Sequence, residues 1–309
     1  MNKLHKAKIL ITGANGLLGQ KLVQLILQEG EYELLPSGLG DSRFPEDWQV
    51  ENWISMDIRD PQQVQNVFDQ FQPDYLIHTA AMTNVDQCEQ ELEACKDLNI
   101  NAVHHLVSAC EKHHTHMIHL STDFIFDGEA GPYDEEAAPN PVNFYGWTKL
   151  EAERIIERSN IKSAIVRTVL VYGVANDMSR SNIILWVKES LEQGKKIQVV
   201  NDQVRTPTLA EDLAKGCLQI IKKNAVGKFN ISGKDLLTPY DMAIATAEYF
   251  DLDKSLISET DSQHFKQIAQ RPMRTGFIIN KAFQELDYRP KSFMDGIGIL
   301  SKQLKLADS

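Results

Sequence analysis

The sequence predicts an α/β fold, in which a doubly wound parallel sheet is joined to a smaller mixed α/β domain. Short apolar runs alternate with helical patterns through the first 170 residues. This alternation is typical of a parallel sheet covered by helices on both faces. The chain has 309 residues, of which 42% are hydrophobic and 24% charged. These values are ordinary for a globular protein and exclude extended disorder and fibrous classes.

The predicted elements follow one another in a regular order at first. Short strands are predicted at 9–11, 32–38, 75–77, 117–120 and 164–166. Helices are predicted between or after them at 17–29, 61–71, 91–113 and 145–159. After Gly173 the order changes to a helix at 183–192, a strand at 196–200, a helix at 210–222 and a strand at 228–232. We therefore predict one domain from residues 1–173 and 209–233, and a second, packed against it, from 174–208 and 234–309.

Charge and cysteine content restrict the partners and the compartment. The 43 acidic residues exceed the 32 basic ones and leave a net charge of −11, which disfavours broad binding to nucleic acid or to an anionic membrane. Four cysteines without a C-x-x-C pair do not form a disulfide scaffold in a chain of this length. The basic N-terminal segment leads into an apolar run that Thr12 and Gly13 interrupt. We expect a cytoplasmic protein without nucleic-acid or membrane partners.

Three glycines follow the first predicted strand at the spacing G-x-x-G-x-x-G, namely Gly13, Gly16 and Gly19. Glycine suits a tight turn, a close backbone approach to a pyrophosphate and the packing of a helix on a strand. The first N–H groups of the following helix would face the anion. The pattern predicts a Rossmann-like nucleotide site, and a plain strand–turn–helix junction is the alternative.

A second motif is Tyr145-x-x-x-Lys149, the one pair with this spacing in the chain. Residues four apart on a helix share a face, so the ammonium group would lie near the phenol. A tyrosine with a pKa of about 10 transfers protons poorly at neutral pH, and a neighbouring cation favours the phenolate. Tyr145 lies 23 residues after Thr122, at the end of a predicted strand. We predict that Thr122, Tyr145 and Lys149 form a catalytic set.

The order of these motifs resembles that of the extended short-chain dehydrogenases/reductases. The resemblance implies that Tyr145 delivers a proton to a carbonyl oxygen that Thr122 orients, while Lys149 holds the ribose of NADPH or NADH. It implies that Asp57 and Ile58 hold the adenine and that 79–81 line the nicotinamide ribose. The implied cofactor-binding residues are Gly13, Asn15, Gly16, Leu17, Leu18, Gly19, Arg43, Asp57, Ile58, Thr79, Ala80, Ala81, Tyr145 and Lys149.

The second predicted strand bears on the choice between the two cofactors. It ends in Ser37-Gly38, without the acidic residue that would bind a ribose 2′-hydroxyl and repel a 2′-phosphate. This favours NADPH or the use of both cofactors. Arg43 is the candidate partner of the 2′-phosphate, and a solvated loop arginine is the alternative.

The segment 121–128, S-T-D-F-I-F-D-G, is similar to S-T-D-Y-V-F-D-G of the dTDP-4-dehydrorhamnose reductase family. The segments 80–86, 167–173 and 200–208 extend the resemblance, which implies reduction of the 4-keto group of a deoxy nucleotide-sugar. The implied substrate-binding residues are Val85, Thr122, Asp123, Phe124 and Tyr145 near the sugar and Arg205 near the nucleotide. Arg180 and Arg205 are the cations expected to attract the anionic ligands locally. Phe124 replaces the family's tyrosine and Leu170 its tryptophan, which puts the identity of the substrate in doubt.

Other functions on the same fold are weighed against this one. A 4,6-dehydratase needs a glutamate where Phe124 stands, and phenylalanine cannot transfer protons. A nucleotide-sugar 4-epimerase uses the same tyrosine and lysine and stays open. The regulatory subunit of methionine adenosyltransferase resembles the same family, so a non-catalytic subunit also stays open. A homodimer is left open as well.

Two further groups of polar residues are assigned to the solvated surface. The histidines between His113 and His119 span a helix end and the next strand and share no single face. They are predicted to be a solvated terminus, so no metal site is expected. Glu135 and Glu136 are predicted to form a solvated edge of the substrate cleft.

Overall fold

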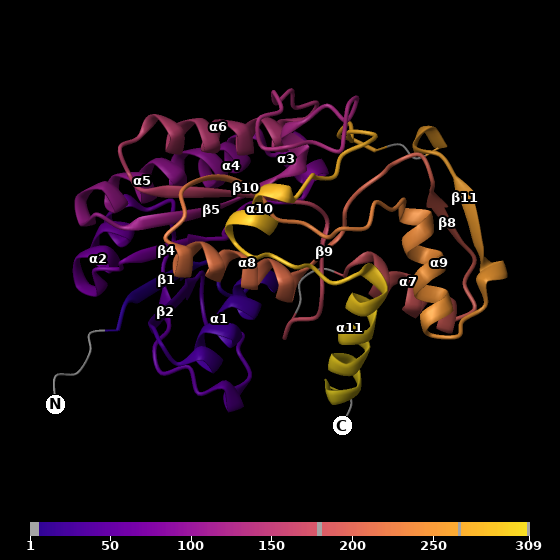
Figure 1. Cartoon of the computed structure of the whole chain (residues 1–309), viewed down its shortest axis with the longest axis horizontal. Coiled ribbons are helices and arrows are strands. Elements are labelled where there is room, and N and C mark those ends of the chain that lie inside the picture. Colours follow the sequence, from indigo (N-terminus) through magenta and orange to yellow (C-terminus); the bar gives the residue numbers. More distant parts are fainter. Residues whose placement is uncertain (1–5, 178–180, 265–266, 308–309) are drawn as a thin grey trace.

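A seven-stranded parallel sheet forms the centre of the computed structural model, which describes residues 6–177, 181–264 and 267–307 (Figure 1). The order of its strands is β10-β6-β5-β4-β1-β2-β3, and every neighbouring pair is parallel. The strands are β1 (Lys8–Thr12), β2 (Glu33–Gly38), β3 (Ile54–Ser55), β4 (Tyr75–His78), β5 (His116–Thr122), β6 (Ser163–Thr168) and β10 (Gly227–Asn230). The predicted doubly wound sheet is confirmed.

Helices cover both faces of this sheet because alternate strand residues point to opposite sides. On one face, Ile9 and Ile11 of β1 pack with α1 (Leu17–Glu29) and α8 (Ala210–Lys223). On the other face, Leu10 packs with α2 (Pro61–Phe71), α5 (Ala102–His113) and α6 (Phe144–Arg158). Figure 1 shows the two helical layers on either side of the strands. Burial of both faces explains why the strands read as continuous apolar runs.

The segment predicted as one helix at 91–113 is helical almost throughout, but it includes a π-helical turn. After α3 (Val85–Gln90), it forms α4 (Leu92–Lys96), a π-helical turn η2 (Asp97–Asn101) and then α5. The side chain of Asn99 accepts a hydrogen bond from the Met82 backbone N–H at 2.8 Å and donates to the Met82 carbonyl at 3.0 Å. Its amide also donates to Thr148 Oγ1 at 3.1 Å. These contacts hold the wider turn next to the residues of α6, as π-turns in helices often do near sites.

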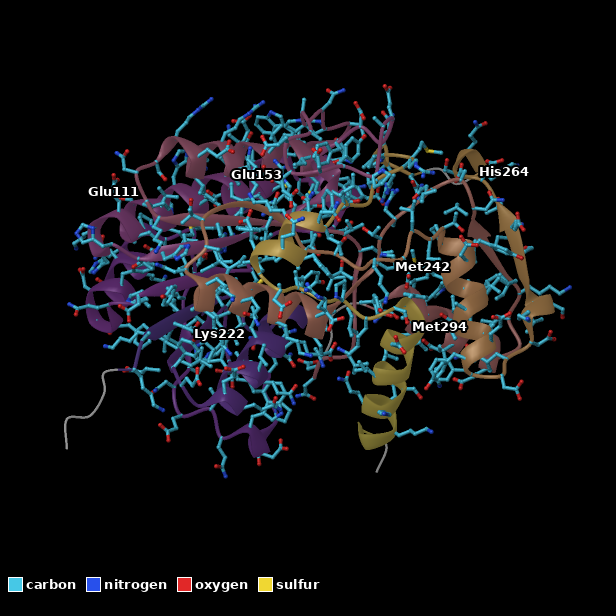
Figure 2. The ribbon with its side chains drawn as sticks, in the orientation of Figure 1. Glu111, Glu153, Lys222, Met242, His264 and Met294 are labelled. Atoms are coloured by element: carbon cyan, nitrogen blue, oxygen red, sulfur yellow. The ribbon has the colours of Figure 1, made fainter. Side chains whose placement is uncertain are left out.

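The later part of the chain forms a smaller α/β region beside the sheet, to its right in Figure 1. Two two-stranded parallel ribbons pair β8 (Ile197–Val200) with β11 (Ile257–Thr260), and β7 (Val171–Tyr172) with β9 (Thr208–Leu209). Its helices are α7 (Ile183–Glu192), α9 (Pro239–Tyr249) and α11 (Phe293–Ala307), while α10 (Asn280–Glu285) contacts β10. Met242 of α9, labelled in Figure 2, is fully buried in a core shared with α7 and α11.

The shorter helical turns connect these elements. They are η1 (Glu46–Trp48), η3 (Asp123–Ile125), η4 (Lys254–Leu256) and η5 (Ser262–His264). Strand β10 joins the large sheet beside β6 although α7 and β8 precede it in the chain. This return supports the predicted division into discontinuous domains, which stays a proposal. Among the residues described here, no helix combines the length and apolar character needed to cross a membrane.

Candidate active site

A cavity of about 770 Å³ opens at the carboxyl ends of β1, β4 and β5. The strand order reverses between β1 and β4, and in doubly wound sheets ligands bind at such a point. The cavity brings together most of the predicted site residues. These are Gly13, Asn15, Gly16, Leu17, Leu18, Gly19, Thr79, Ala81, Val85, Thr122, Asp123, Phe124, Tyr145, Lys149 and Arg205.

The glycine turn has no room for side chains at two of its three positions. Gly13 has φ of 73°, and a Cβ there would lie 2.6 Å from the backbone N of Ala80. A Cβ on Gly19 would lie 2.4 Å from the Gly13 carbonyl oxygen. Gly16 is the N-cap of α1, and no side chain caps this helix. The first N–H groups of α1 therefore face the cavity without a side-chain acceptor, an arrangement that fits the pyrophosphate of a dinucleotide.

The three predicted catalytic residues come from β5 and α6. Thr122 ends β5, while Tyr145 and Lys149 lie one turn apart near the start of α6, whose N-cap Asn143 accepts a hydrogen bond from the Gly146 N–H. The Tyr145 side chain is 8% exposed and is hydrogen-bonded with Thr122. Hence one hydroxyl, one phenol and one ammonium group lie in the same wall of the cavity.

Burial dominates the protonation of this set. It raises the pKa of Tyr145 well above its ordinary value, and the hydrogen bond with Thr122 opposes this rise. Burial lowers the pKa of Lys149 to about 8, opposed by the nearby carboxylate of Glu153. The expected lowering of the Tyr145 pKa by Lys149 is not seen in the protein alone, because the main causes of the shift are burial, Thr122 and nearby acidic and thiol groups. At neutral pH the phenol keeps its proton and the amine is mostly charged, which suits proton donation.

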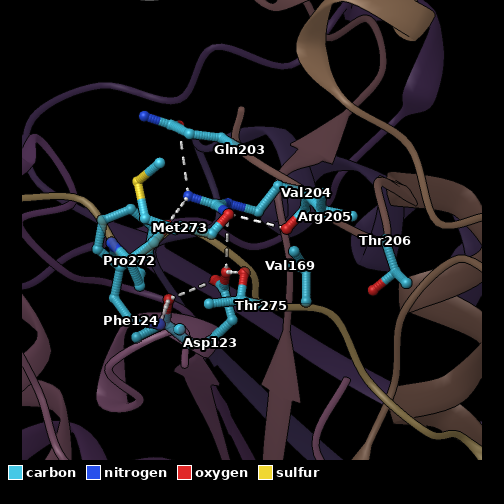
Figure 3. A network of polar contacts seen from close by, with 12 residues as sticks. Asp123, Phe124, Val169, Gln203, Val204, Arg205, Thr206, Pro272, Met273 and Thr275 are labelled. Carbon is cyan, nitrogen blue, oxygen red and sulfur yellow. Dashed lines mark hydrogen bonds and ion pairs between the residues drawn. The ribbon is translucent and has the colours of Figure 1, made fainter. Parts of the chain in front are cut away.

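A buried charge network adjoins Thr122 (Figure 3). Asp123 accepts hydrogen bonds from Thr275 Oγ1 at 2.5 Å and from Thr122 Oγ1 at 3.2 Å, and its Oδ2 lies 3.8 Å from Nε of Arg205. Arg205 also donates to the carbonyl oxygen of Pro272 at 2.6 Å. Burial raises the pKa of Asp123, and Arg205 opposes the rise. Arg205 therefore links the 203–205 segment to the 272–275 segment, and its contact with a nucleotide stays a prediction.

Four predicted cofactor residues lie outside the cavity lining. Ala80 packs beneath Gly13, Ile58 is buried, and Asp57 forms an ion pair with Arg59 at 2.7 Å. Arg43 is half-exposed and lies 3.4 Å from Asp177, while its backbone N–H donates to the Asn15 side chain at 2.9 Å. Their predicted roles toward the cofactor stay proposals. Arg180 lies outside the described residues.

The cavity also contains residues that were not predicted. Arg271 reaches it from the last third of the chain and forms a two-point ion pair with Asp86 of α3, at 2.6 and 2.7 Å. This pair lowers the pKa of Asp86 to about 2. Ser181, Asn182, Gln203 and Pro239 line the cavity as well. No local spacing could have identified Arg271, because its contact with Asp86 spans 185 residues.

Two predictions about surface polar residues are wrong in part: His114 and Glu136 are exposed as predicted, but His119 and Glu135 are not. His119 is fully buried, with Nε2 3.2 Å from Nζ of Lys149. Glu135 is also buried, and its carboxylate accepts the Asn230 backbone N–H at 2.9 Å. Both errors arose because the neighbours that enclose these side chains come from distant parts of the chain. Across the described ranges, no group of three or more histidine, cysteine or acidic side chains is arranged to hold a metal ion.

The fold and this cavity define an NAD(P)H-dependent oxidoreductase of the extended short-chain dehydrogenase/reductase class. Within that class, the chain belongs to the RmlD substrate binding domain family, whose model matches residues 7–305.

Similar proteins bear different functional names. The chain is 30% identical to dTDP-4-dehydrorhamnose reductase of Aggregatibacter actinomycetemcomitans, over 93% of this chain and 96% of that protein. It is 31% identical to methionine adenosyltransferase 2 subunit beta of Bos taurus, over 86% and 76%. The crystal structure of dTDP-4-dehydrorhamnose reductase from Bacillus anthracis in complex with NADP superposes with a TM-score of 0.85 and 27% identity, covering 97% of this chain and 100% of that one.

Proposed function

We propose that this protein reduces the 4-keto group of a deoxy nucleotide-sugar with NADPH or NADH, and that dTDP-4-dehydrorhamnose is its substrate. The observation that carries this proposal is the convergence of Thr122, Tyr145 and Lys149 in one cavity with the glycine turn. The similarity to dTDP-4-dehydrorhamnose reductases over nearly the whole chain supports the choice of substrate.

The residues of the chain supply the binding and the proton transfer. When bound, the reduced nicotinamide supplies the hydride that reaches the carbonyl carbon. Thr122 donates a hydrogen bond to the carbonyl oxygen, and Tyr145 gives this oxygen its proton, since burial keeps the phenol protonated. Lys149 remains charged below a pH of about 8 and donates to the ribose hydroxyls. The phenolate left on Tyr145 then regains a proton from solvent, because burial favours the neutral phenol.

Apolar residues form the part of the cavity assigned to the sugar. Phe124 packs edge-on against Tyr145 with ring centres 5.8 Å apart, and Val85 begins α3. Leu170 has φ of 36° and is 44% exposed at the cavity, so its side chain is available to a ligand. Leucine offers a smaller flat surface than the family's tryptophan does. We therefore expect a sugar held with a smaller aromatic contact area than in that family.

A panel assay tests the proposal. The purified protein is mixed with keto nucleotide-sugars that differ in base and in sugar, and the consumption of NADPH or NADH is followed. We expect consumption with dTDP-4-dehydrorhamnose and a product reduced at C4, identified by NMR. Dinucleotide binding without consumption for any member of the panel would contradict a reductase.

A non-catalytic subunit is the second candidate, because methionine adenosyltransferase 2 subunit beta has a similar identity to this chain, 31%, over a smaller share of both chains. The complete catalytic set favours turnover. Stable copurification with a methionine adenosyltransferase catalytic subunit, together with no turnover in the panel, would favour the subunit instead. A 4-epimerase would interconvert two nucleotide-sugars in the same panel without net consumption of cofactor.

We also propose a cytoplasmic location and a homodimer. The location is supported by the cysteine content of the sequence, which has four cysteines in 309 residues and no C-x-x-C pair, as is usual in a reducing compartment. Light scattering of the purified protein tests the dimer, and a monomeric mass would exclude it.

A further inference from the structure

The ammonium group of Lys149 has one polar side-chain contact within the described part of the chain, and its partner is a histidine. Nζ of Lys149 lies 3.2 Å from Nε2 of His119, and the two side chains are 3% and 0% exposed. Glu153 follows one turn later on α6, but its carboxylate is bound by Arg167 at 2.7 Å and by Ser121 at 2.5 Å. His119 is therefore the group that holds the lysine in place.

His119 belongs to a polar row that crosses three strands. The sheet register places Thr12 of β1 opposite His78 of β4, and His78 opposite His119 of β5. The two imidazole rings are 5.2 Å apart, and Nδ1 of His78 lies 2.7 Å from Oγ1 of Thr12. The row shares its sheet face with Leu10, two residues before Thr12, and therefore faces the helical layer that contains α6. A row of polar groups on an apolar face places an acceptor directly under Lys149.

The direction of the hydrogen bond follows from the charges. An ammonium group can only donate, so Nε2 of His119 accepts, and the proton of the neutral ring is on Nδ1. Burial, with the charge of Lys149 adding to it, holds the pKa of His119 well below its ordinary value, and burial lowers that of His78 to about 3. Both rings are therefore neutral at working pH. Nδ1 of His119 has no hydrogen-bond partner among the described residues.

We propose that His119 is a positioning residue, which accepts one N–H of Lys149 and thereby aims the other two into the cavity toward the cofactor ribose and Tyr145. The effect of His119 on turnover rests on the proposed function. The hydrogen bond between His119 and Lys149 does not, because it is present in the protein without ligand. The Tyr-x-x-x-Lys spacing in the sequence says nothing about such a support from β5.

Removal of His119 would leave the ammonium group without its acceptor. The groups that face Lys149 are Tyr145 and Glu153 on α6, Cys95 on α4, His78 on β4, whose pKa the charge of Lys149 also lowers, and His119 itself on β5. The carboxylate of Glu153 favours the charged amine, but it stays bound to Arg167. A hydrogen bond to the charged form raises the pKa of a lysine, so its loss shifts that pKa below about 8 and deprotonates the amine at lower pH.

The experiment compares His119→Leu, His119→Gln and His116→Leu in the full-length protein. For His119→Leu we expect kcat near neutral pH to fall about tenfold and the alkaline limb of the kcat profile to move about one pH unit lower. His119→Gln places an amide oxygen near the former position of Nε2, so it should restore most of the kcat and most of the position of the alkaline limb. His116 is a buried histidine of the same strand outside the cavity, so His116→Leu should leave the alkaline limb unchanged.

A second measurement does not depend on turnover. In the free wild-type protein labelled with ¹⁵N-histidine, the signals lost in His119→Gln identify His119. The ¹⁵N signal of its Nε2 should be that of an unprotonated nitrogen, and Lys149→Met should change the chemical shift of this signal. A protonated Nε2, or leucine and glutamine variants with the same pH profile, would overturn the proposal. If wild type reduces no keto nucleotide-sugar but Nε2 is an acceptor, the proposed function fails and the hydrogen bond stands.

Discussion

The substitution Tyr145→Phe removes one hydroxyl from the wall of the cavity and leaves the ring. The phenylalanine keeps the edge contact with Phe124 and the packing against Cys88 and Cys95. It loses the hydrogen bond with Thr122 and the proton that the reaction requires. The variant therefore separates proton transfer from the shape of the site.

The expected loss can be estimated from these contacts. A positioned general acid contributes about 10²–10⁴ in rate, equivalent to about 3–5 kcal/mol of barrier at 1.36 kcal/mol per factor of ten. The lost hydrogen bond costs only about 1 kcal/mol of stability. Affinity for NADPH should change less than twofold, because Lys149 and the glycine turn remain.

The assay measures kcat with the active keto nucleotide-sugar and NADPH affinity by fluorescence titration. Tyr133→Phe is the matched control, since Tyr133 is 7% exposed, donates to Asp127 at 2.9 Å and lies outside the cavity. Tyr133→Phe should have a lower free energy of unfolding than wild type and an unchanged kcat. A Tyr145→Phe variant that retains more than a tenth of the wild-type kcat would refute the assignment of the proton donor.

Three further predictions concern the cofactor site and the core. Gly19→Ala should lower the free energy of unfolding by about 1–3 kcal/mol and weaken NADPH binding, because the new Cβ would lie 2.4 Å from a backbone atom. Gly16→Ala is the control, since the nearest atom to a Cβ there is 3.3 Å away. Equal urea midpoints for the two alanine variants would contradict this prediction. Glu153→Leu should lower the free energy of unfolding by about 3–5 kcal/mol, because it leaves the buried charge of Arg167 without its partner. The double variant Glu153→Leu/Arg167→Met should lose less stability, because both charges are removed. A double variant no more stable in urea than Glu153→Leu would disprove this. Arg43→Ala should weaken NADPH binding more than NADH binding in parallel titrations, and equal losses would remove Arg43 from the 2′-phosphate site.

Local patterns predicted the elements that have a period or a spacing. The predicted helix at 17–29 coincides with α1, and that at 61–71 with α2, because apolar periodicity and flanking turn residues mark both. The helix predicted at 91–113 is helical from Leu92 to His113, but it includes a π-helical turn at 97–101 that was not predicted. Asn99 lies in this turn, and its amide bonds to the backbone of Met82, 17 residues earlier. Periodicity alone cannot detect such a bond.

The sequence by itself determined the sheet, the glycine turn and the candidate set of Thr122, Tyr145 and Lys149, because each follows from short-range spacing on a strand or a helix. Only the tertiary structure decided what supports that set. Asp123 meets Thr275 across 152 residues, and Lys149 meets His119 across 30. The physical reason is that burial and hydrogen-bond partners depend on which strands become neighbours. A histidine that reads as solvated in a linear pattern therefore becomes the sole acceptor beneath a buried ammonium group in the described fold.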